Sequence, residues 1–263
     1  MDQDRYIDGT GRLDLSGIDW NAARCVGLTD DERFVLSYFA DIESQTIAYL
    51  RDLLLMKDAL APRTMAFLTV WNYEEFFHGR ALTRLLAECG DRPGEHRVAD
   101  VRAHARISER VQAFGANLLS RVFRDSFPAV YYCWGAINEL TTLQGYEALG
   151  AATRNPALAE LCRRIAKQER RHFAWYFNSA RELLRASPTA RRLARTLLRL
   201  AWSPVGAGVK TDREVARLVR SLFPGSQAAS LSATIDRRVD ALPGLADLAL
   251  MTRYLGRLST APC

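Results

Sequence analysis

Cysteine and long apolar runs are both scarce in this chain of 263 residues, and each shortage excludes a class of protein. The five cysteines are an odd number without metal-binding spacing, which predicts reduced thiols in a cytoplasmic protein rather than a disulfide framework. No segment approaches the roughly 18 uninterrupted apolar residues of a membrane span. The polar N-terminus, residues 1–5, is unlike a secretion signal. We therefore expect a cytoplasmic protein with no membrane span.

Glycine and proline are sparse as well, with 16 and 9 residues, and strand-like alternation is hard to find. Ala, Leu and Arg dominate the long segments, which favours helices. No stretch has the composition of a long linker, so we expect one all-α domain over residues 1–263. Its core bundle is predicted to occupy about residues 30–186, with accessory helices over 188–258.

Acidic residues are too few to balance the arginines, and the formal net charge is +6. The excess lies mainly after residue 160. A basic surface can attract nucleic acid, an anionic membrane or an acidic protein, but a solvated helix face needs no partner. No nucleic-acid-binding motif accompanies the charge, so no nucleic-acid partner is expected.

Histidine is the scarcest informative residue, with four in the chain, and two of the four have a glutamate three positions earlier. These Glu-x-x-His motifs are Glu75–His78 and Glu169–His172. With 13 glutamates, chance would give roughly 0.2 such pairs. Residues three apart lie on one face of a helix, so each motif can aim a carboxylate and an imidazole at one point.

Apolar periodicity predicts four long helices that could carry such motifs. The first 28 or so residues look irregular. The first long helix should be capped by Asp30 or Asp31 and run to about Lys57, with Ile47 and Leu54 in its apolar stripe. The second should begin at Pro62 and end near Gly90, and the third should begin at Pro128. The fourth follows the turn at 155–156. A shorter helix is expected at about 98–114, and accessory helices at 188–202, 211–222 and 243–258.

The first and third long helices each place one glutamate in an otherwise apolar stripe. Glu43 precedes Glu75 by 32 residues, and Glu139 precedes Glu169 by 30 residues. Either span fits two antiparallel helices joined by a turn, which would bring each pair of glutamates to one level. Glu147 is the rival to Glu139, but it lies two turns farther along.

Six buried ligands in one bundle predict a metal centre, because buried carboxylates are costly unless paired or bound to a cation. Two glutamates and two Glu-x-x-His pairs are the ligand set of ferritin-like di-iron bundles. Four carboxylates balance two divalent cations, and mixed oxygen and imidazole donors suit iron, with manganese also possible. The alternative is that these residues form ion pairs on solvated faces. The predicted ligands are Glu43, Glu75, His78, Glu139, Glu169 and His172.

Several further side chains lie near the predicted ligands in the sequence. Thr142 follows Glu139 by one turn and could hydrogen-bond oxygen or relay a proton, or could bond its own backbone. Glu74 points off the ligand face, so it would lie behind the ligands or on the surface. Aromatic residues such as Trp71 and Tyr146 are expected in the core more than in electron transfer.

At these motifs the sequence resembles the soluble acyl-acyl carrier protein desaturases. Residues 71–82 fit that family's frame Trp-x-x-Glu-Glu-x-x-His-Gly-x-x-Leu, and residues 161–172 are similar to its fourth-helix pattern. Thr142 falls where the family has its oxygen-site threonine. The resemblance covers about residues 30–180 well, and the length is closer to the shorter bacterial members than to the plant enzymes.

The resemblance implies a ferritin-like fold, a homodimer and two irons (Fe²⁺/Fe³⁺). It also implies electrons from a ferredoxin-type donor and an acyl chain presented on acyl carrier protein, whose acidic surface suits a basic one. Since no rubredoxin-like Cys-x-x-Cys pair is present, the donor should be a separate protein. The expected function is dioxygen-dependent desaturation of a fatty acyl chain.

Two departures from the family keep the substrate open. Phe76 and Phe77 replace the usual Asn-Arg between Glu and His, and Gln168 replaces an Asp linked to carrier-dependent electron delivery. Hydroxylation or N-oxygenation of a small or tethered natural-product substrate is therefore the alternative. A ferroxidase or iron-binding protein is a further one, although it would leave the helices after residue 187 unexplained.

Overall fold

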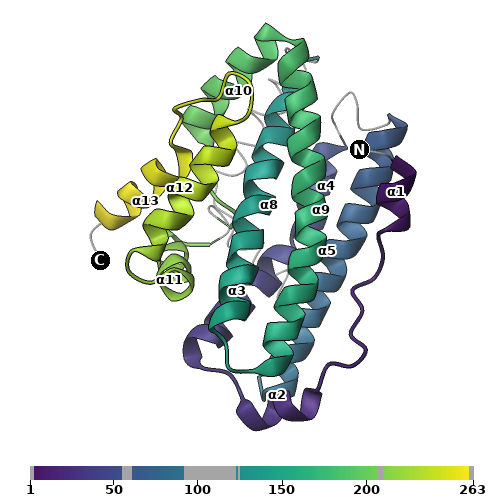
Figure 1. The fold of residues 1–263 in the computed structure, drawn as a ribbon, viewed down its shortest axis with the longest axis vertical. Coiled ribbons are helices and arrows are strands. Elements are labelled where there is room, and N and C mark those ends of the chain that lie inside the picture. Colours follow the sequence, from purple (N-terminus) through teal and green to yellow (C-terminus); the bar gives the residue numbers. More distant parts are fainter. Residues whose placement is uncertain (1–2, 55–60, 92–122, 124, 207–209, 261–263) are drawn as a thin grey trace.

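Four helices form a bundle whose axes run roughly together (Figure 1). The computed structural model describes residues 3–54, 61–91, 123, 125–206 and 210–260. Within these ranges α8 packs against α9, α3 against α5, and α5 against α9, and no strand occurs. The predicted all-α, ferritin-like four-helix bundle is therefore confirmed. Its members are α3 (Asp30–Glu43), α5 (Pro62–Glu88), α8 (Phe127–Ala152) and α9 (Pro156–Ala186).

The starts of these helices follow from local chemistry. Proline lies in the first turn of α5, α8 and α9, where its missing N–H costs no hydrogen bond. Asn155 caps α9 by accepting from the backbone N–H groups of Ala157 and Leu158. The predicted aspartate cap of α3 is wrong. Thr29 is the cap, since it and Glu32 each accept a hydrogen bond from the other's backbone N–H.

The first long helix is interrupted directly after Glu43, whereas we expected it to continue to about Lys57. A turn at Ser44 and Gln45 separates α3 from α4 (Thr46–Leu53), and residues 55–60 lie outside the described ranges. Ser44 Oγ donates to Ala40 O and Thr46 Oγ1 donates to Glu43 O, so side chains compete for backbone carbonyls at the break.

The break changes which residues of α4 face the core. Ile47 and Leu54, which the sequence placed in the apolar stripe, are 55% and 52% exposed. The apolar side chain of this helix that is buried among the described residues is instead Leu53. The prediction failed because it assumed one uninterrupted helical register across residues 44 and 45.

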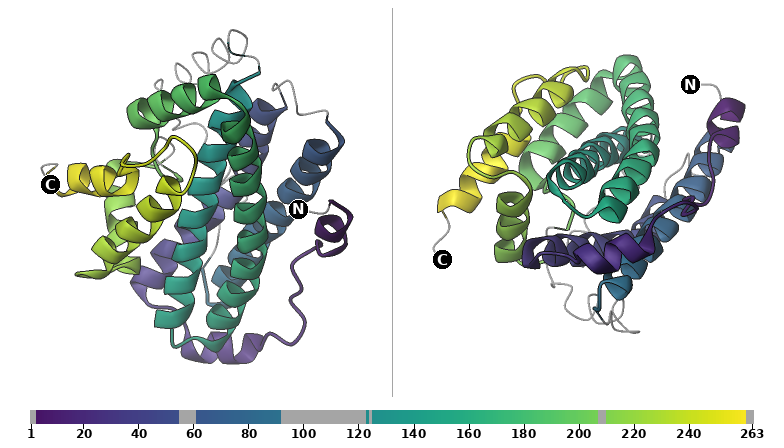
Figure 2. Two further views of the ribbon diagram at one scale, coloured as in Figure 1. Left: turned by 45° about the horizontal axis from the view of Figure 1, so that its top comes forward. Right: turned by 60° about the horizontal axis from the view of Figure 1, so that its bottom comes forward.

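The flanking helices were predicted in part. We expected the first 28 residues to be irregular, but they contain two helices, α1 (Gln3–Asp8) and α2 (Trp20–Val26), joined by an extended segment (Figure 2). Helix α1 contacts α5, and α2 contacts both α5 and α9. Asp19 caps α2 by accepting from Ala22 N–H. The helix expected at 98–114 lies outside the described residues.

After the bundle, α10 (Pro188–Ala201) and α11 (Asp212–Leu222) confirm their predictions. Helix α12 (Gln227–Asp240) was missed. The last helix, α13 (Leu250–Thr260), begins seven residues later than the expected start at 243. Positive φ angles at Gly244, Asp247 and Ala249 keep residues 244–249 out of a right-handed helix. That the whole chain is one domain stays a prediction.

The sequence predicts neither a membrane span nor a disulfide framework. Among the described residues, no helix is both long and apolar enough to cross a membrane. Cys25, Cys89, Cys133 and Cys162 are free thiols there. Burial raises the pKa of the Cys133 and Cys162 thiols, so neither is activated as a nucleophile.

Close packing of α8 against α9 depends on glycine at one position. A Cβ atom on Gly135 would lie 2.7 Å from the ring of Tyr176. Tyr176 is itself held by Phe67 and Trp175, whose rings stack with centroids 3.7 Å apart. The ring therefore has little freedom to move away, and the two helices can approach only where α8 has no side chain.

We predict that Gly135→Ala destabilises the protein. Overpacking should cost about 1–3 kcal/mol, and the higher helix propensity of Ala would recover at most about 1 kcal/mol. Gly256→Ala on α13 is the matched control, because nothing lies within 4 Å of its added Cβ. Urea unfolding measures both variants. Equal stability of the two variants would contradict the packing argument.

Candidate metal centre

Six acidic and imidazole side chains meet near the middle of the bundle, one or two from each helix. Helix α3 provides Glu43, α5 provides Glu75 and His78, α8 provides Glu139, and α9 provides Glu169 and His172. All six are buried. The structure thus brings together every residue that the sequence proposed as a ligand.

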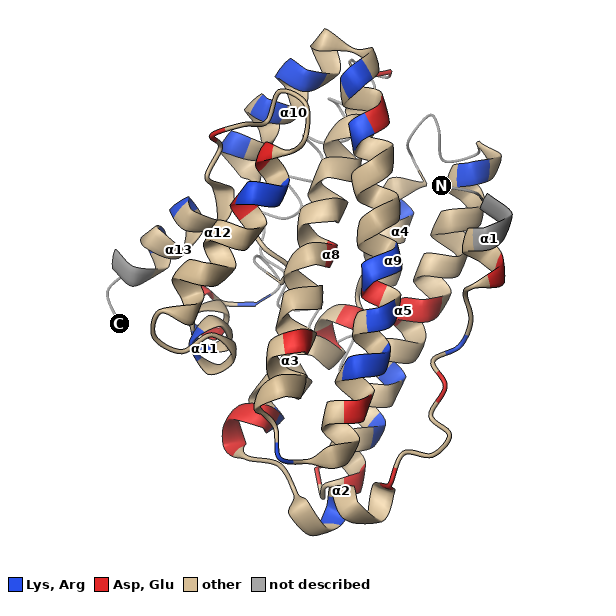
Figure 3. Cartoon of the chain, viewed as in Figure 1, with Lys and Arg blue, Asp and Glu red and all other residues tan. Residues whose placement is uncertain are grey.

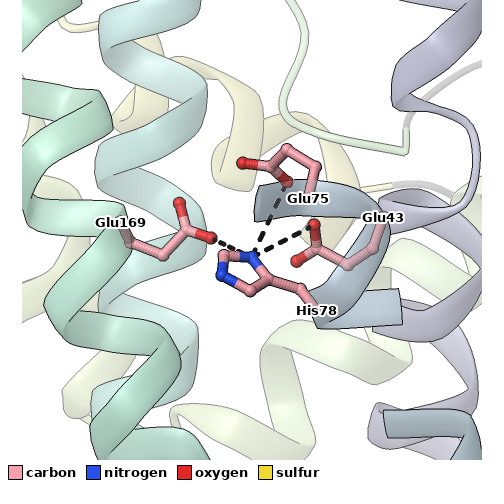
Figure 4. A group of neighbouring side chains, drawn as sticks. All are labelled: Glu43, Glu75, His78 and Glu169. Atoms are coloured by element: carbon pink, nitrogen blue, oxygen red, sulfur yellow. Dashed lines mark ion pairs between the residues drawn. The ribbon is translucent and has the colours of Figure 1, made fainter. Parts of the chain in front are cut away.

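The first group of four surrounds the Nδ1 atom of His78 (Figure 4). That nitrogen lies 3.2 Å from Glu169 Oε1, 3.8 Å from Glu43 Oε2 and 3.9 Å from Glu75 Oε2. One donor atom from each of the four residues lies within 4.8 Å of the other three. This separation suits four donors around one cation.

The second group surrounds the Nδ1 atom of His172 in the same way. It lies 2.9 Å from Glu75 Oε1, 3.5 Å from Glu169 Oε2 and 3.6 Å from Glu139 Oε2. Its donor atoms also lie within 4.8 Å of one another.

Glu75 and Glu169 belong to both groups. Each therefore has one oxygen directed toward each histidine, which is the arrangement of a carboxylate that bridges two cations. Glu43 with His78 completes one group, and Glu139 with His172 completes the other. The Glu-to-Glu spacings in the sequence predicted that Glu43 lies level with Glu75 and Glu139 with Glu169, and the members of each of these pairs occur together in one group.

Several buried oxygen and nitrogen atoms of the predicted ligands have no hydrogen-bond partner among the described residues, although buried polar atoms normally have one. His172 Nδ1 and Glu75 Oε1 are close, yet they do not have hydrogen-bond geometry. Unsatisfied lone pairs that converge on two points fit a pair of divalent cations. The atoms are Glu75 Oε1, His78 Nδ1, Glu169 Oε1 and Oε2, and His172 Nδ1.

Without a cation the centre should hold protons. Burial raises the pKa of Glu139 to about 8, and the charge of Glu169 adds to the effect. Burial opposes the charged form of His78, but the carboxylates of Glu169 and Glu43 outweigh it and raise its pKa to about 10. Cation binding must therefore displace protons.

The Nε2 atom of each histidine, which points away from the centre, contacts a residue of the other Glu-x-x-His helix. That residue directly precedes the glutamate of the motif. His172 Nε2 lies 2.8 Å from Glu74 Oε2, and His78 Nε2 lies 2.7 Å from Gln168 Oε1. These contacts leave both Nδ1 atoms facing the centre. Glu74 is fully buried, so the surface alternative considered for it is wrong.

Sequence reasoning missed the partner of Gln168, although a signal was present. Both motifs have a polar side chain directly before the glutamate, at Glu74 and Gln168. A residue one position away is rotated by about 100° on a helix, which carries it toward the neighbouring helix rather than the shared face.

Two aromatic residues hold the terminal glutamates. Tyr146 Oη donates to Glu43 Oε1 at 2.5 Å, and Trp71 Nε1 donates to Glu139 Oε1 at 3.0 Å. We had expected both rings mainly as core. They are buried in the core, but each also orients one predicted ligand, as residues behind metal ligands commonly do.

Thr142 and Glu147 lie on α8 beyond Glu139. Thr142 is half-buried, three residues after Glu139, and its role toward oxygen stays a prediction. Glu147 contacts Arg170 and Gln144 at the edge of the bundle, and it belongs to neither ligand group. The geometry therefore agrees with the choice of Glu139 over Glu147.

Comparison with known proteins gives one match. A family model described as fatty acid desaturase matches residues 57–199, which is more than half of the chain. The matched span contains five of the six predicted ligands and omits Glu43. No curated protein matches the chain significantly.

We predict that the metal-free protein loses stability as the pH rises from 7 toward 10. The pKa values of His78 and Glu139 in the folded protein, about 10 and 8, exceed their ordinary values of 6.5 and 4.5. The folded protein therefore holds protons that the unfolded chain has released. Each such proton lowers the free energy of unfolding by about 1.4 kcal/mol per pH unit.

Urea unfolding in the presence of a chelator, repeated across this pH range, measures the effect. Saturating Mn(II) should remove most of the dependence, because the cation displaces the same protons. Constant or rising stability of the chelated protein would contradict the proton assignment.

We also predict that Glu139→Ala lowers the Fe(II) content from two ions per chain to about one, because one of the two groups loses a ligand. Glu147→Ala is the matched control on the same helix and should retain both ions. Anaerobic loading followed by desalting and metal analysis gives the count. The opposite ranking of the two variants would exchange their roles.

Proposed function

The chain belongs to the fatty acid desaturase family, and on this premise we propose that it is a dioxygen-dependent di-iron oxidase that desaturates an acyl chain carried on acyl carrier protein. The observation that carries the proposal is the pair of ligand groups sharing Glu75 and Glu169. Family membership supports an oxidoreductase, and the shared carboxylates support a binuclear centre.

The donor set supports iron as the metal. Carboxylates and imidazoles together suit Fe(II), and a closed structural zinc site would use a tetrahedral set, often with thiolates. Among the described cysteines none is in either ligand group. Bound iron would supply the reduction of dioxygen and the removal of hydrogen from an unactivated carbon.

The protein's own contribution is to hold the ligands and to exclude water. Glu43 and Glu139 are fixed by Tyr146 and Trp71, so they are oriented before a cation arrives. The buried rings of Trp71 and Tyr146 also separate the ligands from solvent, and exclusion of water limits side reactions. Thr142 is proposed to hydrogen-bond oxygen or to relay a proton beside Glu139.

The proposed partner is supported by charge. Lys and Arg residues recur along α9 and on α10 and α12 (Figure 3). Arg185, Arg192 and Arg199 are exposed there. Such a surface favours association with an acidic carrier protein. A ferredoxin-type electron donor and a homodimer complete the proposal, and both rest on the resemblance to acyl carrier protein desaturases.

A second candidate is oxygenation, by hydroxylation or N-oxygenation, of a small or tethered molecule. One observation favours it: Gln168, where the acyl carrier enzymes have Asp, is buried and bonded directly to His78. The departure therefore affects the centre itself. Oxidation of iron without an organic substrate is the third and weakest possibility.

Turnover distinguishes these candidates. We expect the iron-loaded protein, with ferredoxin, a reductase and dioxygen, to desaturate a saturated acyl chain attached to acyl carrier protein. Mass spectrometry would detect the alkene product as a loss of two hydrogens. Gain of one oxygen would favour the oxygenase. If the iron-loaded protein converts no carrier-bound acyl chain, whatever the chain length, the desaturase proposal is overturned.

The carrier itself is tested by charge. Reversing Arg192 and Arg199 to Glu should raise KM for acyl carrier protein about tenfold or more at low salt and leave kcat within about twofold, because surface charges act mainly on encounter. Arg213→Glu on α11 changes an exposed arginine on a different helix and should have a smaller effect. Equal effects would argue against a specific docking surface.

A further inference from the structure

The two halves of the metal centre differ behind their histidines. His172 Nε2 bonds a carboxylate, that of Glu74, whereas His78 Nε2 bonds a neutral amide, that of Gln168. The ligands themselves are paired symmetrically, so this is the chief chemical difference between the two positions.

The direction of the Gln168 amide is fixed by its neighbours. Its Nε2 group lies 2.9 Å from Gly11 O and 2.9 Å from Glu74 Oε1, which are both acceptors. The amide nitrogen must therefore point to them, and Oε1 must accept a hydrogen bond from the Nε2–H group of His78. A cation that displaced the remaining proton of His78 would bind at its Nδ1, with only a neutral acceptor behind the ring.

The Glu74 carboxylate is paired with a guanidinium and firmly placed. Besides His172, it accepts from Arg171 at 2.6 Å, from Gly11 N at 3.1 Å and from Gln168. Arg171 is a quarter exposed, so its charge is partly screened by water, whereas Glu74 is fully buried. A buried carboxylate behind an imidazole raises the basicity of that ligand.

We propose that the two metal positions are inequivalent and load in order, with the His172 position binding a divalent cation first and more tightly. Glu74 and Gln168 are the positioning residues that set this order. The inference rests on the proposed binuclear centre. Residues behind metal ligands change affinity by about 10–100-fold, so dissociation constants that differ by about tenfold or more are expected.

Titration of the metal-free protein with Co(II) under nitrogen tests the order without any turnover. Calorimetry and the visible absorption of Co(II) should both resolve two steps, one ion each. In Glu74→Gln the tighter step should weaken by about 10–100-fold, while the weaker step moves by less than about threefold. In Gln168→Leu the dissociation constant of the weaker step should change by a larger factor than that of the tighter step.

Arg171→Gln separates electrostatics from scaffolding. Removing this guanidinium leaves the negative charge of Glu74 without its counterion, so the affinity of the tighter Co(II) step should increase by about threefold or more. If the Glu74–Arg171 pair were only structural, both Glu74→Gln and Arg171→Gln would weaken the same step. Arg170→Gln is the matched control, since Arg170 bonds Glu147 and not Glu74.

The outcomes separate this inference from the proposed function. Two Co(II) ions bound in one indistinguishable step would overturn the inference and leave the binuclear centre standing. Weakening of the tighter step by both Glu74→Gln and Arg171→Gln would also overturn it. Binding of fewer than two ions to the wild-type protein would instead contradict the centre. Circular dichroism of each variant verifies that it has folded.

Discussion

The rest of the structure depends on the cost of burying four carboxylates between helices. Glu43, Glu75, Glu139 and Glu169 are all buried, and like charges at this separation cannot all persist without compensation. Protons on the centre, or two divalent cations, supply it. The raised pKa values of His78 and Glu139 are a consequence of the same constraint, and the unsatisfied donor atoms are another.

The bundle is built around that constraint. Gly79 lets the junction of α3 and α4 approach α5, since an added Cβ would lie 3.0 Å from Ser44 Oγ and 3.3 Å from Glu43 Cβ. The helix break after Glu43 occurs at this contact. Farther along the bundle, Gly135 brings α8 close to α9. Backbone proximity therefore sets how deeply the carboxylates of neighbouring helices reach toward one another.

Paired ligands joined by two shared carboxylates connect the fold to the proposed chemistry. The same pairing exposes where the halves differ, because Glu74 and Gln168 occupy equivalent places with different charge. The backbone of Gly11, in the extended segment between α1 and α2, hydrogen-bonds both side chains and so lies on the outer side of the centre. Family membership alone would not have indicated this asymmetry.

The sequence by itself determined the helices of the bundle apart from the cap and the end of the first, the proline and asparagine starts of the others, and which six side chains meet at the centre, because helical periodicity is a local property. It did not determine the break at Ser44, the short helices before residue 28, or the partners of Glu74 and Gln168. These depend on contacts between segments far apart in the chain, such as Gly11 with Gln168. Local sequence patterns predict which face of a helix a residue occupies, and only the packed structure decides which residues of other segments contact it on that face.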